Sequence, residues 1–292
     1  MNGSEGEGGA SVFDLPKIDC HAHVTDPDRF PYGAGIAYHP RGQEIGTADQ
    51  LVHLMDAFNI RHTLLVQPNS GYGPDNACLL DAIARHPGRF SGMAIVAPDA
   101  GAAELQALRE QGVIGVAFNP TLYGNDHYRD CRPLIARLAD LGMMLNLQVV
   151  GDQFRQYLPW IREIPVTVLI DHTGCPRPSL GRDQPGFAEL LTSADTGRVW
   201  VKLSGYAKFS AGRFPFADCH PSIEALVGAF SIDRCLWASD WPYLRAPDRQ
   251  DVGLLLKLLE RLFPAPADRA RVLWHSPAAL LGLTSSGEGH PI

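Results

Sequence analysis

Several signatures of other protein classes are missing from this sequence of 292 residues. Its six cysteines form no CxxC pair, so they indicate neither a disulfide framework nor a zinc knuckle. No run of basic residues is dense enough to follow a phosphate backbone, and the formal net charge is −7. We therefore expect no nucleic-acid partner.

Long apolar runs are missing as well. No run reaches the roughly 18 to 20 residues that a membrane-spanning helix needs, and the N-terminus lacks the charged-then-apolar order of a signal peptide. These absences predict a cytoplasmic protein without a membrane partner, and they leave both a monomer and a homo-oligomer open. Residues 1–12 are rich in Gly, Ser and Glu, which predicts a disordered N-terminal tail.

What the sequence does contain is a regular series of short apolar runs. With 45% hydrophobic and 20% charged residues, the chain suits a globular protein with a large core. Runs rich in Val, Ile and Leu recur roughly every 25 to 35 residues, and their near-continuous hydrophobicity is typical of parallel strands buried on both faces. Eight runs are predicted as strands, at residues 17–24, 62–69, 90–98, 113–120, 143–150, 167–174, 199–206 and 235–242.

Helix-patterned stretches separate these runs. Thr47 precedes one such stretch as a capping residue, and Gly112 ends another. Strand and helix alternate eight times, which predicts an α/β protein with one (β/α)8 TIM-barrel domain over residues 13–292. An open doubly wound sheet is the alternative architecture, but the GxGxxG loop expected after its first strand is absent.

Two histidines stand at the end of the first predicted strand. Side chains two residues apart in a strand point to the same face, so His21 and His23 project together into the barrel mouth. A lone histidine is most often a satisfied core residue. Two adjacent imidazoles without partners are costly to bury, and this favours a functional pair.

Two further ionisable residues end buried strands. His172 follows the sixth run and Asp240 follows the eighth. Carboxyl ends of barrel strands meet at one face, where such enzymes assemble their active sites. Three histidines and one aspartate at that face predict a metal or proton-transfer site.

These residues carry a family resemblance. HxH on strand one, histidine on strand six and aspartate on strand eight resemble the amidohydrolase superfamily. The resemblance narrows to the branch that includes 2-pyrone-4,6-dicarboxylate lactonase and sugar-acid lactonases, and it covers about residues 15–283. The segments that carry it are DCHAHV, LLVQPNSGYGPDN, GVAFN, VLIDHTGCP, VWVKLSG, ASDWP and HSPAALLGL.

The resemblance implies a hydrolase that opens a small lactone by attack of water. Asp240 would accept a proton from the water as general base. His172, His21 and His23 would polarise the carbonyl, either directly or through one divalent cation, for which Zn²⁺ is favoured.

The chain departs from the wider superfamily at two metal positions. Strand four ends in Phe118 and Asn119, with neither a lysine to be carbamylated nor a glutamate to bridge two ions. Strand five offers Gln148 where metal-dependent members present histidine, and a neutral amide is a poor zinc ligand. A single ion and a metal-free site both stay open. The ligands of a single ion would be His21, His23 and Asp240.

Substrate-binding candidates surround these strand ends. Ala117 stands where the pyrone-dicarboxylate lactonase places an arginine, so that dicarboxylate is not expected as the substrate. The long segment 25–46 is read as a lid or specificity wall. Cationic candidates are Arg41, Arg177 and Lys208. The predicted substrate-binding residues are Asn69, Tyr72, Asn119, Tyr123, Gln148, Lys202, Tyr206, Trp241 and Arg41.

Two other functions compete with the lactonase. A metal-dependent decarboxylase of a small aromatic or unsaturated acid shares this residue set, but it usually keeps the histidine that Gln148 replaces. A non-catalytic binding barrel would be expected to lose its polar site residues, and all four central ones are present.

Overall fold

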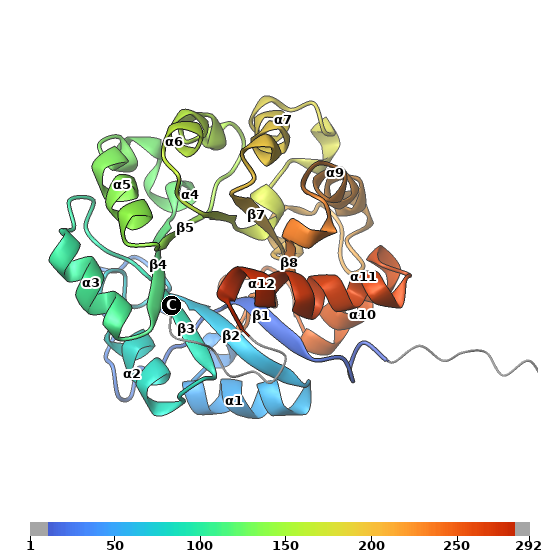
Figure 1. Ribbon diagram of the computed structural model, residues 1–292. Helices are drawn as coiled ribbons and strands as arrows, with labels where there is room; N and C mark the ends of the chain where they lie inside the picture. Colours follow the sequence, from blue (N-terminus) through green and yellow to red (C-terminus); the bar gives the residue numbers. More distant parts are fainter. Residues whose placement is uncertain (1–10, 284–292) are drawn as a thin grey trace, which may run out of the picture.

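The computed structural model describes residues 11–283, in which parallel strands alternate with helices around one barrel (Figure 1). Each strand pairs in parallel with the next, in the order β1 to β8. This confirms the predicted (β/α)8 barrel. The strands are β1 Lys17–Ala22, β2 Ile60–Val66, β3 Phe90–Ala94, β4 Val113–Phe118, β5 Met144–Leu147, β6 Val168–Ile170, β7 Val199–Leu203 and β8 Cys235–Trp237.

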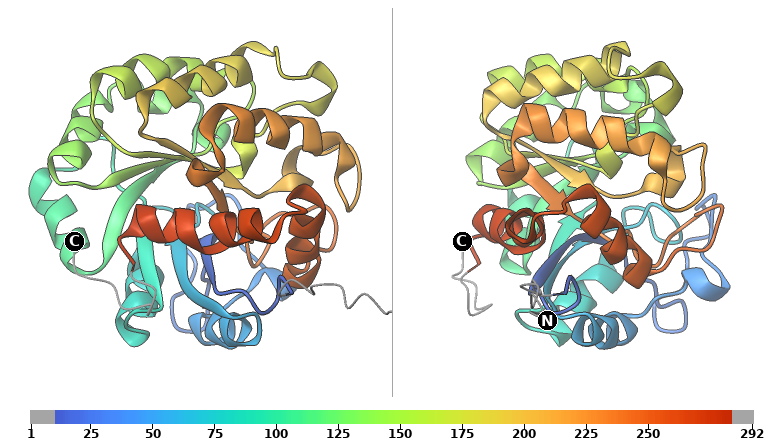
Figure 2. Two further views of the ribbon diagram at one scale, coloured as in Figure 1. Left: turned by 45° about the vertical axis from the view of Figure 1, so that its right-hand side comes forward. Right: turned by 90° about the vertical axis from the view of Figure 1, so that its right-hand side faces the viewer.

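Helices surround these strands (Figure 2). The first helix begins after Thr47, as predicted, because the Thr47 Oγ1 accepts from the Gln50 N–H at 3.3 Å while the Gln50 side chain accepts from the Thr47 N–H at 3.0 Å. The helices are α1 Ala48–Ala57, α2 Ala77–Arg85, α3 Ala102–Glu110, α4 Pro120–Tyr123, α5 Arg132–Asp140, α6 Leu158–Glu163, α7 Pro185–Thr192, α8 Tyr206–Phe209, α9 His220–Phe230, α10 Val252–Leu262, α11 Pro266–Ala270 and α12 Ser276–Leu281.

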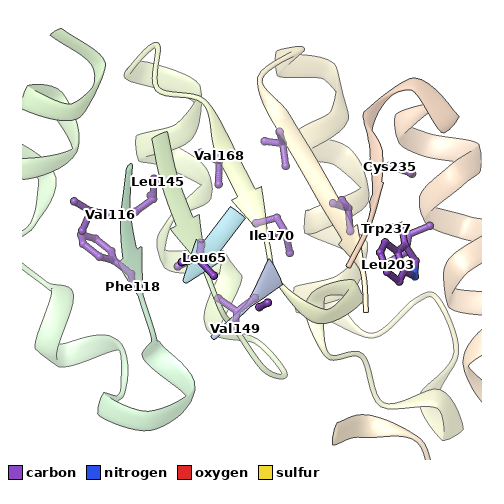
Figure 3. Packing of buried hydrophobic residues seen from close by; sticks show 14 of the residues in the cluster. Leu65, Val116, Phe118, Leu145, Val149, Val168, Ile170, Leu203, Cys235 and Trp237 are labelled. Carbon is purple, nitrogen blue, oxygen red and sulfur yellow. The ribbon is translucent and has the colours of Figure 1, made fainter. Parts of the chain in front are cut away.

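The strands divide their side chains between two apolar clusters. In β6, Val168 and Ile170 join the cluster between strands and helices (Figure 3). Leu169, between them in sequence, joins the cluster inside the barrel. This alternation is the period of two expected for a strand buried on both faces. Trp274 and Leu281, near the end of the described chain, complete the inner cluster. Leu281 lines a hollow with Phe90 and Val113, the first residues of β3 and β4, so the end of the described chain covers the amino-terminal end of the strands. The opposite, carboxyl-terminal end is where barrels of this kind place their active sites.

The barrel is closed between β1 and the segment after β8. Ala22 forms a parallel bridge with Trp241, the Asp240 N–H donates to the His21 carbonyl at 2.9 Å, and the His23 N–H donates to the Trp241 carbonyl at 2.7 Å. Backbone groups of four predicted site residues, His21, His23, Asp240 and Trp241, thus make the closure. The contacts that close the barrel therefore also fix the backbone of the site.

All eight strands are shorter than the predicted runs, and β6 and β8 are the shortest, with three residues each. β6 ends at Ile170 and β8 at Trp237, whereas the apolar runs were extended to residues 174 and 242. The chain leaves the extended conformation because His172 and Asp240 have φ angles of 51° and 63°. Both residues consequently stand in turns just beyond their strands.

The described chain begins close to its first packed residue. Residues 1–10 of the predicted tail and residues 284–292 of the predicted domain lie outside the described residues. Val12 is fully buried at 0% exposure, and the Phe13 ring lies 6.1 Å from that of Phe58. Within residues 11–283, no helix combines the length and the apolar character of a membrane span.

Candidate active site

The four central residues predicted from the sequence converge on one carboxylate oxygen. Asp240 Oδ1 lies 3.8 Å from His21 Nε2, 3.6 Å from His23 Nε2 and 3.9 Å from His172 Nε2. All four side chains are buried, and this oxygen has no hydrogen-bond partner among the described residues. A buried, unpartnered carboxylate oxygen facing three imidazoles indicates a place for a proton, a water or a cation.

Backbone strain is concentrated in the two segments that supply His172 and Asp240. Within residues 11–283, nine non-glycine residues have a positive φ, and six of them lie after β6 or β8. Each such residue costs on the order of 1–3 kcal/mol and persists only where the surrounding structure enforces it. The barrel therefore holds these segments in a shape that they would not adopt alone. The six are His172, Thr173, Cys175, Asp240, Tyr243 and Arg245.

Hydrogen bonds on the far ring nitrogens set the tautomers of the paired histidines. His23 Nδ1 lies 2.7 Å from the Val66 carbonyl, and His21 Nδ1 lies 3.0 Å from Asp171 Oδ1. A carbonyl and a carboxylate only accept, so in the neutral rings both Nδ1 atoms carry the hydrogen and both Nε2 atoms present lone pairs. Lys202 Nζ also lies 3.3 Å from His21 Nδ1, but it has acceptors on Asp171 and Asn146 for its own hydrogens. The two Nε2 lone pairs face each other across 3.3 Å.

Facing lone pairs beside an unpartnered carboxylate fit a divalent cation. The ligating atoms of His21, His23 and Asp240 all lie within 4.8 Å of one another. In a second group, formed by His21, Asp171 and His172, the ligating atoms also lie within 4.8 Å of one another. This second group suits a cation less well, because Lys202 Nζ already lies 3.0 Å from the Asp171 carboxylate and an ammonium repels a metal ion.

A buried network stands behind His21. Asp171 Oδ1 accepts from His21 and pairs with Lys202, and its Oδ2 accepts from Asn146 Nδ2 at 2.6 Å. Lys202 Nζ also donates to the Asn146 side-chain oxygen. All four residues are at most 1% exposed. Burial raises the pKa of Asp171, but Lys202 and His21 lower it more, so the pKa lies well below its usual range.

The charge states of the site residues follow from burial and from one lysine. Burial lowers the pKa of His21 to about 4 and that of His172 to about 3, so both are neutral at physiological pH. Burial raises the pKa of Asp240, but the charges of Lys208 and then His172 lower it by more than burial raises it. Lys208 Nζ lies 3.0 Å from Asp240 Oδ2. The Asp240 pKa is thus well below its ordinary value, and the carboxylate stays ionised.

A cavity of about 470 Å³ lies over this site. Asp240 lines a smaller hollow of about 20 Å³ that shares Lys208 with the larger cavity. No aspartate or glutamate of the described chain lines the larger cavity. Its polar lining includes three predicted substrate-binding residues and two cations: His23, Asn69, Ser70, Asn119, Thr121, Gln148, Lys208 and Arg245.

The predicted aromatic residues lie outside that lining. The Tyr72 hydroxyl accepts a backbone N–H of segment 25–46 at 2.9 Å, and the Tyr206 hydroxyl donates to a β7 carbonyl at 2.9 Å. Tyr123 is 41% exposed and stacks on a neighbouring histidine. The Trp241 ring lies against Gly46, where an added Cβ would meet it at 2.4 Å. Tyr72, Tyr206 and Trp241 thus fasten loops around the site.

Among the predicted cations, Lys208 lines the cavity, whereas Arg41, Arg177 and Lys202 do not. Arg41 is exposed and outside the lining, and Lys202 is fully buried beneath Asp171. Sequence reasoning missed Asp171, although it directly precedes His172, and missed Arg245, which stands beyond the last strand and carries no periodic signal. Lys208 was one of three cationic candidates, and it is the one that reaches Asp240.

Gly205 lies directly against the His172 ring. It has a φ of +67°, and a Cβ added there would lie 2.5 Å from the imidazole. We expect Gly205→Ala to lose about 1–2 kcal/mol from left-handed strain and, in addition, to displace His172 and lower turnover. Gly197→Ala is the matched control, because Gly197 has a φ of +70° and open space around it. Equal turnover in the two variants, measured beside their unfolding midpoints, would show that the His172 position is unimportant.

Known proteins resemble this chain over almost all of its described length. The profile of the amidohydrolase family matches residues 18–283. Among curated proteins, a 4-sulfomuconolactone hydrolase of Hydrogenophaga intermedia is 30% identical over 277 residues, which cover 92% of this chain and 89% of that protein.

Solved structures share the fold, and two of them illustrate their similarity to this chain. A probable 2-pyrone-4,6-dicarboxylic acid hydrolase of Acinetobacter baumannii, crystallised with citric acid, superposes with a TM-score of 0.81 at 24% identity, covering 92% of this chain and 100% of that one. An amidohydrolase of Burkholderia multivorans with bound zinc gives a TM-score of 0.71 at 20% identity, covering 90% and 98%.

Proposed function

Because this chain belongs to the amidohydrolase family, we propose that it is a hydrolase that opens a small lactone by attack of water. The observation that carries the proposal is Asp240 Oδ1, which is buried, ionised and without a hydrogen-bond partner among the described residues, and which faces three imidazole nitrogens. The similarity to a 4-sulfomuconolactone hydrolase supports a cyclic ester as the substrate.

One divalent cation, zinc in our proposal, fits this chain. His21, His23 and Asp240 would hold it, and the facing lone pairs of the two histidines are the reason. When bound, such an ion supplies polarisation of a carbonyl and a water of lowered pKa. Phe118 and Asn119 at the end of β4 provide no bridging ligand for a second ion.

The chain's own residues account for the proton transfers. Asp240 Oδ1 accepts a proton from the attacking water while Lys208 keeps the carboxylate ionised. The Ser204 Oγ lies 3.2 Å from His172 Nδ1. When this hydroxyl donates to Nδ1, the ring carries its hydrogen on Nε2 and donates it in a hydrogen bond to the carbonyl oxygen of the lactone. The new C–O bond forms, the ring C–O bond breaks, and the proton held by Asp240 passes to the departing alkoxide. The product is a hydroxy acid.

A single combined experiment tests this function. Purified protein is analysed for metals and screened against sugar-acid lactones, lactones of aromatic degradation, and small aromatic and unsaturated acids, with base consumption and CO2 release followed together. We expect base consumption without CO2. Release of CO2 from an unsaturated or aromatic acid would identify a decarboxylase, and binding without turnover would identify a binding barrel. We further propose a cytoplasmic enzyme acting on small molecules, as a monomer or homo-oligomer.

Gln148 offers a direct test of the metal proposal. Gln148 and His23 line the same cavity, so an imidazole at position 148 adds a ligand beside the proposed ion. Gln148→His is expected to tighten zinc binding by about tenfold, or roughly 1.4 kcal/mol, in competition with a chelator. Gln148→Leu removes the amide without adding a ligand and should leave the affinity unchanged. Full activity of metal-free wild type would instead favour direct polarisation by the histidines.

A further inference from the structure

The two cations of the large cavity differ in how they are paired. Lys208 Nζ lies 3.0 Å from Asp240, so its charge is already matched by the carboxylate. The Arg245 guanidinium forms no ion pair with any described residue, and its carbon lies 5.2 Å from the centre of the Tyr38 ring. An arginine placed over an aromatic face in a cavity lined by no acid has donors available for an anion.

Segment 25–46 holds Arg245 in place through Glu44. Glu44 Oε1 accepts from the Arg245 backbone N–H at 2.6 Å, and Oε2 accepts from the Tyr38 hydroxyl and from the Arg41 N–H. One carboxylate therefore ties the loop after β1 to the loop after β8. The ring under the guanidinium and the acceptor of its backbone come from the same segment.

Arg245 also has a backbone conformation that it would not adopt alone. Its φ is 59°, in the left-handed region that costs a non-glycine residue on the order of 1–3 kcal/mol. The hydrogen bond to Glu44 stabilises this conformation. Such strain is expected where the fold holds a residue at a functional position, and Arg245, although exposed, lines the cavity.

We propose that Arg245 binds an oxyanion substituent of the substrate, a carboxylate or a sulfonate, and that Glu44 and Tyr38 position it. This inference rests on the proposed lactonase and adds a requirement to it, namely an anionic group on the lactone in addition to the scissile ester. A guanidinium fits either oxyanion because it presents paired N–H donors in one plane.

The test uses three γ-butyrolactones that differ only in one substituent: a carboxylate, a sulfonate or a neutral carboxamide. Arg245→Met should raise KM for both anionic lactones by about tenfold or more, with kcat little changed, and should leave the carboxamide unaffected. A rise in KM for only one of the two anionic lactones also supports the proposal and identifies the oxyanion that Arg245 binds. Arg245→Lys should restore part of the loss, and Glu44→Ala should reproduce part of it.

Arg249→Met is the matched control. Arg249 lies in the same loop, is 80% exposed at its side chain and pairs with Asp251, and it does not line the cavity. Arg249→Met and Arg245→Met change the net charge equally. An equal rise in KM in the two variants would mean that Arg245 acts only through its long-range charge, and this would overturn the proposal. An unchanged KM in Arg245→Met would overturn it too.

A binding measurement separates this inference from the proposed function. Glutarate carries two carboxylates and no scissile ester, so its affinity, measured by calorimetry, does not depend on hydrolysis. Arg245→Met should weaken glutarate binding by about tenfold. Equal affinity in wild type and variant, or no binding to either, overturns the inference. Failure of the wild type to open any lactone overturns the proposed function alone.

Discussion

Asp240→Asn is expected to lower turnover by roughly 10²-fold or more while the barrel remains folded. Asparagine matches the shape of aspartate, but its amide oxygen cannot take a proton at neutral pH. The wild-type carboxylate is ionised because Lys208 and the nearby histidines outweigh its burial, which holds the Asp240 pKa below its usual range. Initial rates of lactone opening, beside a circular dichroism spectrum, measure the effect.

Metal analysis of the same variant separates the two roles given to Asp240. A variant that keeps the ion and loses turnover shows that the carboxylate acts as the base, whereas loss of both shows that it acts first as a ligand. Asp248→Asn is the control, since Asp248 lies in the same loop with its side chain 49% exposed. Near wild-type turnover in Asp240→Asn would remove this residue from the mechanism.

Lys202→Met is expected to lower the free energy of unfolding by about 3–5 kcal/mol, because it leaves a buried carboxylate without its cation. Lys202 is 0% exposed, and its Nζ lies 3.0 Å from Asp171 Oδ1. Asp171 has a depressed pKa, so its ionised form contributes stability above the unfolded pKa and loses it as the pH falls through the folded pKa. Urea unfolding near neutral pH therefore measures the full loss.

A double-mutant cycle shows whether the loss comes from the unpaired charge. Replacing both partners, Lys202→Met with Asp171→Asn, removes the isolated carboxylate and should cost less than the sum of the single changes. Lys257→Met breaks the exposed pair with Glu260 and should change stability by less than about 1 kcal/mol. Strictly additive effects of the first two changes would show that the buried pair is not coupled.

The sequence by itself determined the barrel and the residues at its centre. Apolar runs separated by helical stretches indicate parallel strands, and the strand period of two places His21 and His23 on one face. His172 and Asp240 were found because each follows a buried run, and a barrel brings all strand ends to one rim. These inferences need only local periodicity and one global rule.

Tertiary structure alone decided how the other polar residues are used. Tyrosine is a residue type that often contacts ligands, yet the hydroxyls of Tyr72 and Tyr206 are hydrogen-bonded to backbone groups around the site. Lys202 lies beneath Asp171, and Arg245 reaches the cavity because Glu44, about 200 residues earlier in the chain, accepts its backbone N–H. Such pairings depend on contacts between segments far apart in sequence, and no local pattern records them.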